Sequence, residues 1–343
     1  MVSVIIPTKE RSALLRAALE SVRNQSFTGW ECIVVDDHST DATAHVVGLF
    51  NSSDPRFIYH DLDQTSSGAN AARNYGLKAA RGDLVVFLDS DDALAPHCLE
   101  QRITQMDREP QLDFAVWPTL LFDSEPGDSS LLRNVNTDEN DLDRYLSLDI
   151  PWQTAGVMWR RSALDKVGWW NESLPSWQDW DFHIRALSLN LAYHKYDLPD
   201  SYWRKPWADS LWSQSKQDVH LRAQAALLDE LLPRFLERGC LNEKRKRLLA
   251  GLYFWLARAW HSARRNRLQA VKVWSRAYRK DLISFRRFAE GCKWFSRLTR
   301  GKSRSLAAAF PTWPRELLIE ASPTFWNIPY RVPTTHGVDA SCE

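Results

Sequence analysis

Short apolar runs alternate with amphipathic stretches over the first 117 residues. The apolar runs predict strands, and the stretches between them place apolar side chains three and four residues apart, as helices do. The predicted strands cover residues 2–6, 31–35, 57–60 and 84–88, and the predicted helices cover residues 12–24, 41–49 and 68–80. Strands and helices that alternate in this way predict an α/β fold, with a mostly parallel sheet and helices on both of its faces.

The next hundred residues are less regular. Residues 118–150 are polar and acidic with few apolar side chains, which predicts a loop or flap over one edge of the sheet. Order returns beyond this segment, where a strand and two helices are expected over residues 154–159, 161–167 and 179–189. Residues 200–217 are rich in aromatic side chains and irregular in pattern.

The last third of the chain differs in pattern and in charge. Helical spacing of apolar residues begins near Asp218, and prolines gather in the last thirty or so positions. Residues 1–240 carry 23 basic and 36 acidic side chains, whereas residues 241–304 carry 19 basic and 3 acidic ones, a contrast that the net charge of +1 conceals. We expect three parts: an α/β domain over residues 1–217, a basic helical region over 218–305, and a Pro-containing extended tail over 306–343.

Composition limits the class of protein and the compartment. The 343 residues are 44% hydrophobic and 25% charged, as in an ordinary soluble globular protein. No apolar run approaches the roughly 20 residues of a membrane-spanning helix, and the first residues lack the basic segment of a signal peptide. The five cysteines are scattered, which fits reduced thiols. We therefore expect a cytoplasmic protein.

Polar clusters follow three of the predicted strands at the points where those strands end. They are Pro7-Thr8, Asp36-Asp37 and Asp89-Ser90-Asp91-Asp92. The carboxyl ends of neighbouring parallel strands share one edge of the sheet, and ligands bind there. Several carboxylates at the end of a buried strand need a compensating charge, and closely spaced oxygen ligands suit Mg²⁺ or Mn²⁺. A plainer interpretation of the third cluster is an acidic turn that caps a helix starting near Pro96.

Four motifs, taken in order, resemble glycosyltransferase family 2. They are VSVIIPTKER, CIVVDDHSTD, GANAARNYGLKAARGDLVVFLDSDD and WQDWDFHIRAL. The resemblance covers about residues 1–215 and is closest to bacterial enzymes that build surface glycans. It implies the Rossmann-like GT-A fold, a UDP-sugar donor, a divalent cation and transfer with inversion.

The resemblance assigns the donor and metal contacts to particular residues. The donor nucleotide is expected to contact Pro7, Thr8, Glu10, Asp37, Arg73, Asp89 and Ser90. Asp37 would accept a hydrogen bond from the N3–H of uracil, because a carboxylate only accepts. Asp91 would hold Mn²⁺ or Mg²⁺, with Asp89 reaching the metal or the ribose. Plain alternatives are a strand end at Pro7-Thr8, a helix cap at Asp37 and a surface arginine at Arg73.

Two stretches depart from the usual family pattern. Lys9-Glu10-Arg11 stands where an aromatic residue, Asn and Arg are usual, which weakens the prediction for Glu10. Many metal-dependent relatives also carry a later histidine ligand, and this chain offers only His220 as a weak candidate. The metal site is therefore expected to bind its ion with modest affinity.

Asp179 occupies the position that the family gives to its general base. An inverting transfer needs one carboxylate that removes a proton from the acceptor hydroxyl. Gln178 replaces the usual glutamate beside it, and a helix cap is the alternative role for Asp179. The acceptor is expected to contact Trp152, Gln153, Trp180 and Trp203, with Trp207 nearby, unless these tryptophans belong to the aromatic core.

Two functions from different classes follow. The first is transfer of a sugar from a UDP-sugar to a glycan, polysaccharide or glycolipid acceptor. The second, suggested by Gln178 and the missing histidine, is a catalytically silent scaffold that binds sugar nucleotides or glycans.

The basic helical region admits three interpretations. It packs on the catalytic domain with a solvated face, it touches the inner face of a membrane as a peripheral contact, or it binds nucleic acid. Each Lys or Arg near anionic lipid contributes about 1 kcal/mol to membrane binding. Such binding would be useful if the acceptor is linked to a lipid. Nucleic acid is the least favoured partner, because no known nucleic-acid motif accompanies the charge.

Overall fold

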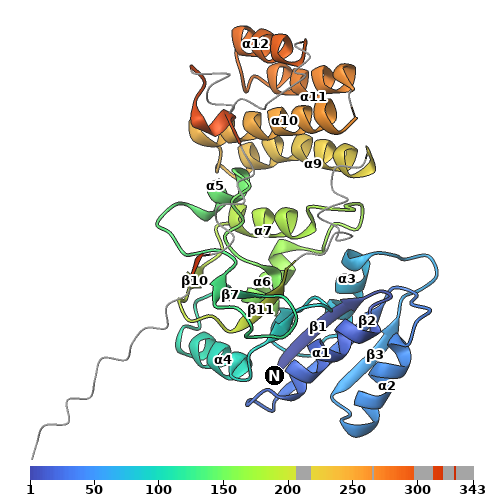
Figure 1. The fold of residues 1–343 in the computed structure, drawn as a ribbon. Helices are drawn as coiled ribbons and strands as arrows, with labels where there is room; N and C mark the ends of the chain where they lie inside the picture. Colours follow the sequence, from blue (N-terminus) through green and yellow to red (C-terminus); the bar gives the residue numbers. More distant parts are fainter. Residues whose placement is uncertain (206–217, 265, 297–311, 320–327, 330–343) are drawn as a thin grey trace, which may run out of the picture.

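The computed structural model describes residues 1–205, 218–264, 266–296, 312–319 and 328–329. Two sheets and the helices around them form one end of the molecule, and a stack of helices forms the other (Figure 1). In the part of the chain that the structure describes, no helix is both long and apolar enough to cross a membrane.

Among the described residues the larger sheet has seven strands, and it is mostly parallel, as predicted. Its strands are, in spatial order, β10 (Tyr193–Lys195), β6 (Phe114–Val116), β9 (Val157–Arg160), β4 (Leu84–Phe87), β1 (Val2–Thr8), β2 (Trp30–Asp36) and β3 (Phe57–Asp61). Only β9 runs antiparallel to its neighbours, β4 and β6. The central strands β1, β2 and β4 are buried along their whole length, which explains their nearly continuous apolar runs.

Helices cover both faces of this sheet, and the alternation of side chains along β1 decides which face each residue meets. Val4 and Ile6 point into a core formed with α1, α2 and α4, whereas Ile5 points into a core formed with α3, α6 and α7. These helices are α1 (Ser12–Arg23), α2 (Thr43–Ser53), α3 (Ala69–Ala79), α4 (Cys98–Arg108), α6 (Arg161–Val167) and α7 (Gln178–Ser188).

A second sheet of five strands corrects the sequence prediction. Its order is β12 (Ile328–Pro329), β8 (Leu131–Leu132), β7 (Thr119–Phe122), β11 (Ser201–Arg204) and β5 (Ala93–Leu94). Residues 118–150, predicted as a loop or flap, supply β7, β8 and the buried helix α5 (Asp141–Leu146). The prediction of irregular structure after residue 200 is wrong for β11, and residues 206–217 lie outside the described part.

The charges of α5 mislead because they are buried and paired rather than solvated. Asp141 is 2% exposed and receives hydrogen bonds from Tyr193 and from Lys195. Asp143 is bound by Lys244 and Arg245, both from the helical region. The polar composition of α5 therefore reflects ion pairs to distant parts of the chain.

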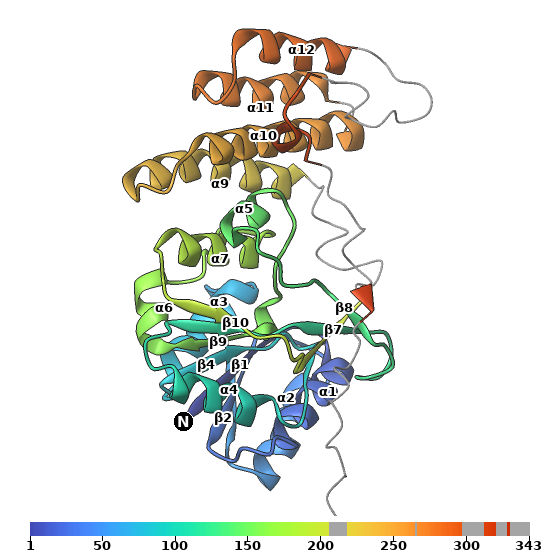
Figure 2. The same cartoon turned by 90° about the vertical axis from the view of Figure 1, so that its left-hand side faces the viewer.

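The helical region packs on α5 and α7 in successive layers (Figure 2). It consists of α9 (Asp218–Glu237), α10 (Glu243–Arg264), α11 (Arg267–Arg279), α12 (Phe285–Ser296) and a short 3-10 turn at Arg315–Leu317. One apolar core runs without a break from Phe87 of the sheet through Trp180 to Leu228 and Leu252 of the helices. The helices thus share a core with the α/β part.

Part of the Pro-containing tail is packed rather than extended. Trp313 is buried, and its ring contacts Phe254 of α10 and Trp274 of α11. Leu317 and Ile319 are also buried in the same core. Most of the remaining tail prediction falls outside the described residues.

Candidate functional site

Parallel pairing brings the three polar clusters to one edge of the large sheet. β1 pairs with β2 on one side and β4 on the other, and Thr8 lies opposite Asp36. The cluster that starts at Asp89 directly follows β4. Two ion pairs join the three strand ends: Lys9 Nζ lies 3.0 Å from Asp37 Oδ2, and Arg11 Nη1 lies 2.6 Å from Asp91 Oδ2.

Asp36 and Asp37 are both buried but have different partners. Asp36 accepts hydrogen bonds from Ser39 and from Tyr59, so it fixes the local loop. Asp37 Oδ2 accepts from Lys9 and from the backbone N–H of Gly68, at 3.0 Å each. Its Oδ1 atom is buried and has no hydrogen-bond partner among the described residues. Asp37 thus keeps one acceptor available to a ligand.

Neither acidic cluster caps a helix, which removes the plainer alternatives. The first N–H of α2, at Thr43, is bonded by Asp41 and not by Asp37. The residue before α4 is His97, with no side-chain cap, and the N–H of Cys98 donates to the carbonyl of Ala95. The carboxylates at residues 89–92 therefore have another role.

Glu10 connects two loops. Its backbone is left-handed, with φ of 49°. Its Oε1 accepts from the N–H of Thr40 at 2.8 Å and from the Thr40 hydroxyl at 3.0 Å, while its own N–H donates to Ser39. The described contacts give Glu10 a role in joining loops, and its contact with a nucleotide stays a prediction.

Arg73 is a buried residue of α3 and not a surface arginine. Its Nη2 lies 2.6 Å from Asp89 Oδ1, and its Nη1 lies 3.4 Å from Gln178 Oε1. The guanidinium stacks over Trp170, with 4.6 Å to the ring centroid. Arg73 therefore joins three elements that are distant in sequence: α3, the loop after β4 and the start of α7.

Arg204 fixes the backbone of the acidic loop. Its N–H donates to Asp92 Oδ1 at 3.0 Å, and its Nε donates to the carbonyl of Asp91 at 3.1 Å. Ser90 and Asp92 are buried, whereas the side chains of Asp89 and Asp91 remain about one-third exposed, at 33% and 29%. The loop therefore turns Asp89 and Asp91 toward accessible space and Asp92 inward.

Four carboxylates share this site and perturb one another. Burial raises the pKa of Asp91, which the charge of Arg11 opposes, and raises the pKa of Asp92 well above its usual value. Burial also raises the pKa of Asp179, against the lowering effect of Arg73. The charge of Asp89 raises the pKa of all three. The site therefore gathers four carboxyl groups beside three arginines, Arg11, Arg73 and Arg204.

The partly exposed carboxylates at this edge fit a divalent cation, although the ligand set is small. Asp89 and Asp91 offer hard oxygen ligands, and Mg²⁺ is commonly held by one or two carboxylates together with phosphates. The described residues contain no group of three His, Cys, Asp or Glu side chains arranged around a metal, so His220 joins no such group. His220 is buried on α9.

Asp179 is the second residue of α7 and is partly exposed. The helix has no side-chain cap, so Asp179 does not cap it. Gln178, before it, donates to the carbonyl of Leu174 and accepts from Arg73. The departure from the usual glutamate thus leaves an amide that bridges α7 to Arg73.

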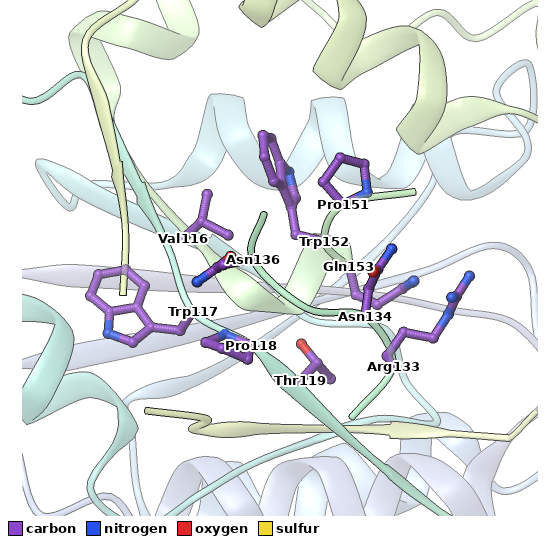
Figure 3. A pocket seen from close by; sticks show the side chains of 10 residues that line it. All are labelled: Val116, Trp117, Pro118, Thr119, Arg133, Asn134, Asn136, Pro151, Trp152 and Gln153. Carbon is purple, nitrogen blue, oxygen red and sulfur yellow. The ribbon is translucent and has the colours of Figure 1, made fainter. Parts of the chain in front are cut away.

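Some of the residues expected to contact the acceptor lie in the core, and others line a pocket. Trp180 is 4% exposed and its indole N–H donates to the carbonyl of Tyr145, so the described contacts place it in the core, and its contact with an acceptor stays a prediction. Trp152 is equally buried and donates to His183, yet with Gln153 it lines a small pocket beside Thr119 (Figure 3). 

Trp203 is partly buried, and Arg133 lies over its ring at 5.1 Å. Trp207 lies outside the described residues. The acceptor role of Trp203 stays a prediction.

Sequence reasoning assigned no role to three residues of the site. Arg11 lies 2.6 Å from Asp91, and Arg204 holds the loop of residues 91–92. Trp177, which precedes α7, has an unusual left-handed backbone with φ of 61°. Arg11 and Trp177 stand inside two of the motifs quoted from the sequence and could have been found there, whereas nothing local in the sequence marks Arg204.

Comparison with known proteins identifies relatives. Residues 3–168 match the model of glycosyl transferase family 2. A PGL/p-HBAD biosynthesis glycosyltransferase of Mycobacterium bovis is 31% identical over 202 residues, which cover 57% of this chain and 73% of that protein. A GalNAc(5)-diNAcBac-PP-undecaprenol beta-1,3-glucosyltransferase of Campylobacter jejuni is 44% identical over 92 residues, or 27% of this chain and 30% of that protein. The chain therefore spans less than a third of the length of the Campylobacter protein.

A solved structure extends the likeness to the helical region. S. aureus TarS 1–349 in complex with UDP-GlcNAc aligns with a TM-score of 0.61 and 24% identity, over 80% of this chain and 79% of that one. At this identity the likeness concerns the fold, which is the GT-A-like α/β arrangement with C-terminal helices.

Proposed function

The chain belongs to glycosyltransferase family 2, and on this basis we propose that it transfers a sugar from a UDP-sugar to a hydroxyl of a glycan, polysaccharide or glycolipid, with inversion. The observation that carries this proposal is the position of Arg73. It pairs with Asp89 and its charge acts on Asp179, so one buried cation links the carboxylate expected at the donor with the carboxylate expected at the acceptor.

The donor half of the proposal rests on Asp37. Its buried Oδ1 atom is an acceptor without a partner in the described structure, and the N3–H of uracil is the donor that would satisfy it. The N-terminus of α3 begins just after Gly68, which also donates to Asp37, and a helix N-terminus favours a nearby phosphate. The UDP-GlcNAc bound to TarS supports a UDP-sugar donor here.

Asp91 and Asp89 are the residues that would hold Mn²⁺ or Mg²⁺. When bound, such an ion neutralises the charge that develops on the UDP leaving group. Arg11 pairs with Asp91, so this arginine supplies part of the positive charge at the same place.

Asp179 would act as the general base. It removes the proton of the acceptor hydroxyl while that oxygen bonds to C1 of the sugar, on the face opposite UDP, and the bond from C1 to the UDP oxygen breaks. Burial raises the pKa of Asp179, which makes it a stronger base than an exposed aspartate. The undecaprenol-linked substrate named for the Campylobacter relative supports a lipid-linked glycan as one acceptor class.

Release of UDP from a panel of UDP-sugars by the full chain tests the proposal. Asp179→Asn should keep UDP binding and lose transfer, and Asp91→Ala should lose metal-dependent transfer. Asp165→Asn, on an exposed part of α6, is the control and should leave turnover unchanged. Full activity of Asp179→Asn would refute the assignment of the base.

A silent scaffold is the second candidate function. Two observations favour it. Arg73 already pairs with Asp89 and Arg11 with Asp91, and Gln178 replaces the usual glutamate beside Asp179. Calorimetric titration of UDP with and without Mn²⁺, followed by a donor-hydrolysis assay, separates the two functions. Binding without turnover across the donor panel would favour the scaffold.

A further inference from the structure

Trp177, the residue before Gln178 and Asp179, is held in an unfavourable backbone conformation. Its φ and ψ are 61° and 28°, the left-handed region that bulky side chains rarely adopt. Such a residue persists only where surrounding contacts fix it, and these residues gather at functional sites. The contacts of Trp177 therefore indicate what fixes the start of α7.

Those contacts come from the C-terminal helices. The ring of Trp177 lies 4.7 Å from Trp180 on its own helix and 5.6 Å from Trp255 of α10. Beside it, Ser176 Oγ accepts a hydrogen bond of 3.0 Å from Gln224 of α9, and both residues are buried. Two helices from the far end of the chain thus hold the two residues that precede Gln178.

The same helices hold α7 further along its length. Arg234 of α9 lies 3.4 Å from Asp181 Oδ1, and Asp181 is 1% exposed. Arg238, the residue directly after α9, donates to the carbonyl of Arg185 at 3.2 Å and also to the hydroxyl of Ser188. These contacts are spread along α7, so they restrict both its translation and its rotation.

We propose that α9 and α10 position Asp179 for proton transfer, with Trp177 and Trp255 as the main positioning residues. The inference rests on the proposed function, in which Asp179 is the general base. It makes the helical region part of the catalytic unit, because this region fixes the helix that presents the base. A displacement of about 1 Å at a reacting group is enough to lower a rate by about a hundredfold.

Truncation of one ring tests the proposal in the full chain. Trp255→Ala should lower kcat at least tenfold while UDP affinity and the donor KM change less than twofold, because the described ring contact of Trp255 is with Trp177 and not with the donor residues Asp37 or Asp89. Trp255→Phe should restore most of kcat. Trp294→Ala is the matched control: Trp294 is also a partly buried tryptophan of the helical region, and its rings contact Phe254, His261 and Phe295. It should leave kcat within twofold.

A second variant covers the case in which Trp255→Ala fails to fold. Trp177→Gly removes the ring but places a residue that adopts φ of 61° without strain, so it should fold and show the same loss of kcat. An unchanged kcat in Trp255→Ala or Trp177→Gly would overturn the proposal, as would a loss of UDP affinity in step with kcat. Active Trp255→Ala beside inactive Asp179→Asn refutes only the positioning role. A wild-type chain that transfers no sugar refutes the proposed function itself.

Discussion

Arg11 Nη1 lies 2.6 Å from Asp91 Oδ2, so the carboxylate expected to hold a metal is already paired with a cation from the chain. The two residues are 80 positions apart and both are partly exposed. A divalent ion that binds Asp91 has to compete with this ion pair. The strength of the pair therefore sets part of the affinity for the metal.

Replacement of Arg11 should strengthen metal binding. Arg11→Gln frees Asp91 and removes a positive charge that repels the ion. An ion pair between partly exposed groups is worth up to about 1 kcal/mol, which corresponds to roughly fivefold in affinity. We expect Mn²⁺ to bind about fivefold more tightly without donor, as measured by calorimetry. Arg16→Gln, on the exposed face of α1, is the control, and weaker Mn²⁺ binding by Arg11→Gln would contradict the prediction.

The pH dependence of transfer should report the environment of Asp179. A general base acts when deprotonated, so kcat/KM rises with pH through its pKa. Because burial raises that pKa, we expect the acid limb above the value of about 3.9 that is usual for aspartate. At present the charge of Arg73 lowers the pKa of Asp179. Gln178→Glu adds a carboxylate that competes for Arg73 and weakens this effect, so the pKa of Asp179 should rise and the acid limb should move to higher pH.

An uncharged variant separates charge from the lost amide contacts. Gln178→Met also removes the hydrogen bond to Leu174 but adds no charge, so its acid limb should stay closer to that of the wild type. If the limb of Gln178→Glu moved to lower pH, the electrostatic account of Asp179 would be incorrect.

The buried pair of Arg102 and Asp200 should dominate local stability. Both side chains are 0% exposed and their charged atoms lie 2.6 Å apart. Arg102→Met leaves a buried carboxylate without its cation, which should lower the free energy of unfolding by about 3–5 kcal/mol. Urea unfolding at pH 7 measures this loss, and Arg108→Met, exposed on the same helix, should change stability by less than about 0.5 kcal/mol.

Acid should rescue part of that loss. Burial raises the pKa of Asp200 even beside Arg102, and removal of Arg102 raises it further. A group whose pKa is higher in the folded state stabilises the fold at low pH and loses that effect as pH rises through the folded value. The difference between Arg102→Met and wild type should therefore shrink from pH 7 to pH 5. A difference that grew over this interval would argue against an uncompensated carboxylate.

If the helical region touches a membrane, fewer of its basic residues are free to do so than the sequence suggested. Arg276 and Lys280 pair with Asp229 within the region, as Lys244 and Arg245 pair with Asp143 outside it. Such pairs reduce the free positive charge. The exposed residues at the turn between α11 and α12 include the basic Arg279 and Arg286, the aromatic Tyr278 and Phe285, and the acidic Asp281; Phe285 is 65% exposed, and Arg287 is partly exposed.

If this turn touches a membrane, its variants should bind vesicles less well. The double change Phe285→Ser and Arg287→Gln should reduce sedimentation of the full chain with anionic vesicles several-fold, because each basic residue near such lipid contributes about 1 kcal/mol. Leu198→Ser, which alters an exposed apolar residue of the α/β part, is the control. Equal sedimentation of both variants with wild type would leave the region a packing and positioning element.

The sequence predicted the large sheet and the edge where the clusters meet, because buried parallel strands have continuous apolar runs and end abruptly in polar residues. It did not predict α5, since the charges of Asp141 and Asp143 suggested a solvated loop and their partners lie more than 50 positions away. The pairs Arg11 with Asp91 and Arg204 with Asp92 depend on the same long-range geometry, which no local pattern encodes. Helical spacing alone could not tell that Trp180 faces the core.

Three consecutive residues after β1 hold two other loops of the rim: Lys9 and Glu10 bind Asp37 and Thr40 in the loop after β2, and Arg11 binds Asp91 in the loop after β4. These loops are therefore joined to one another before any donor arrives. A donor that binds there exchanges existing contacts for new ones and orders little chain. The entropy lost on binding should accordingly be small for this rim, and association should proceed without a slow loop-folding step.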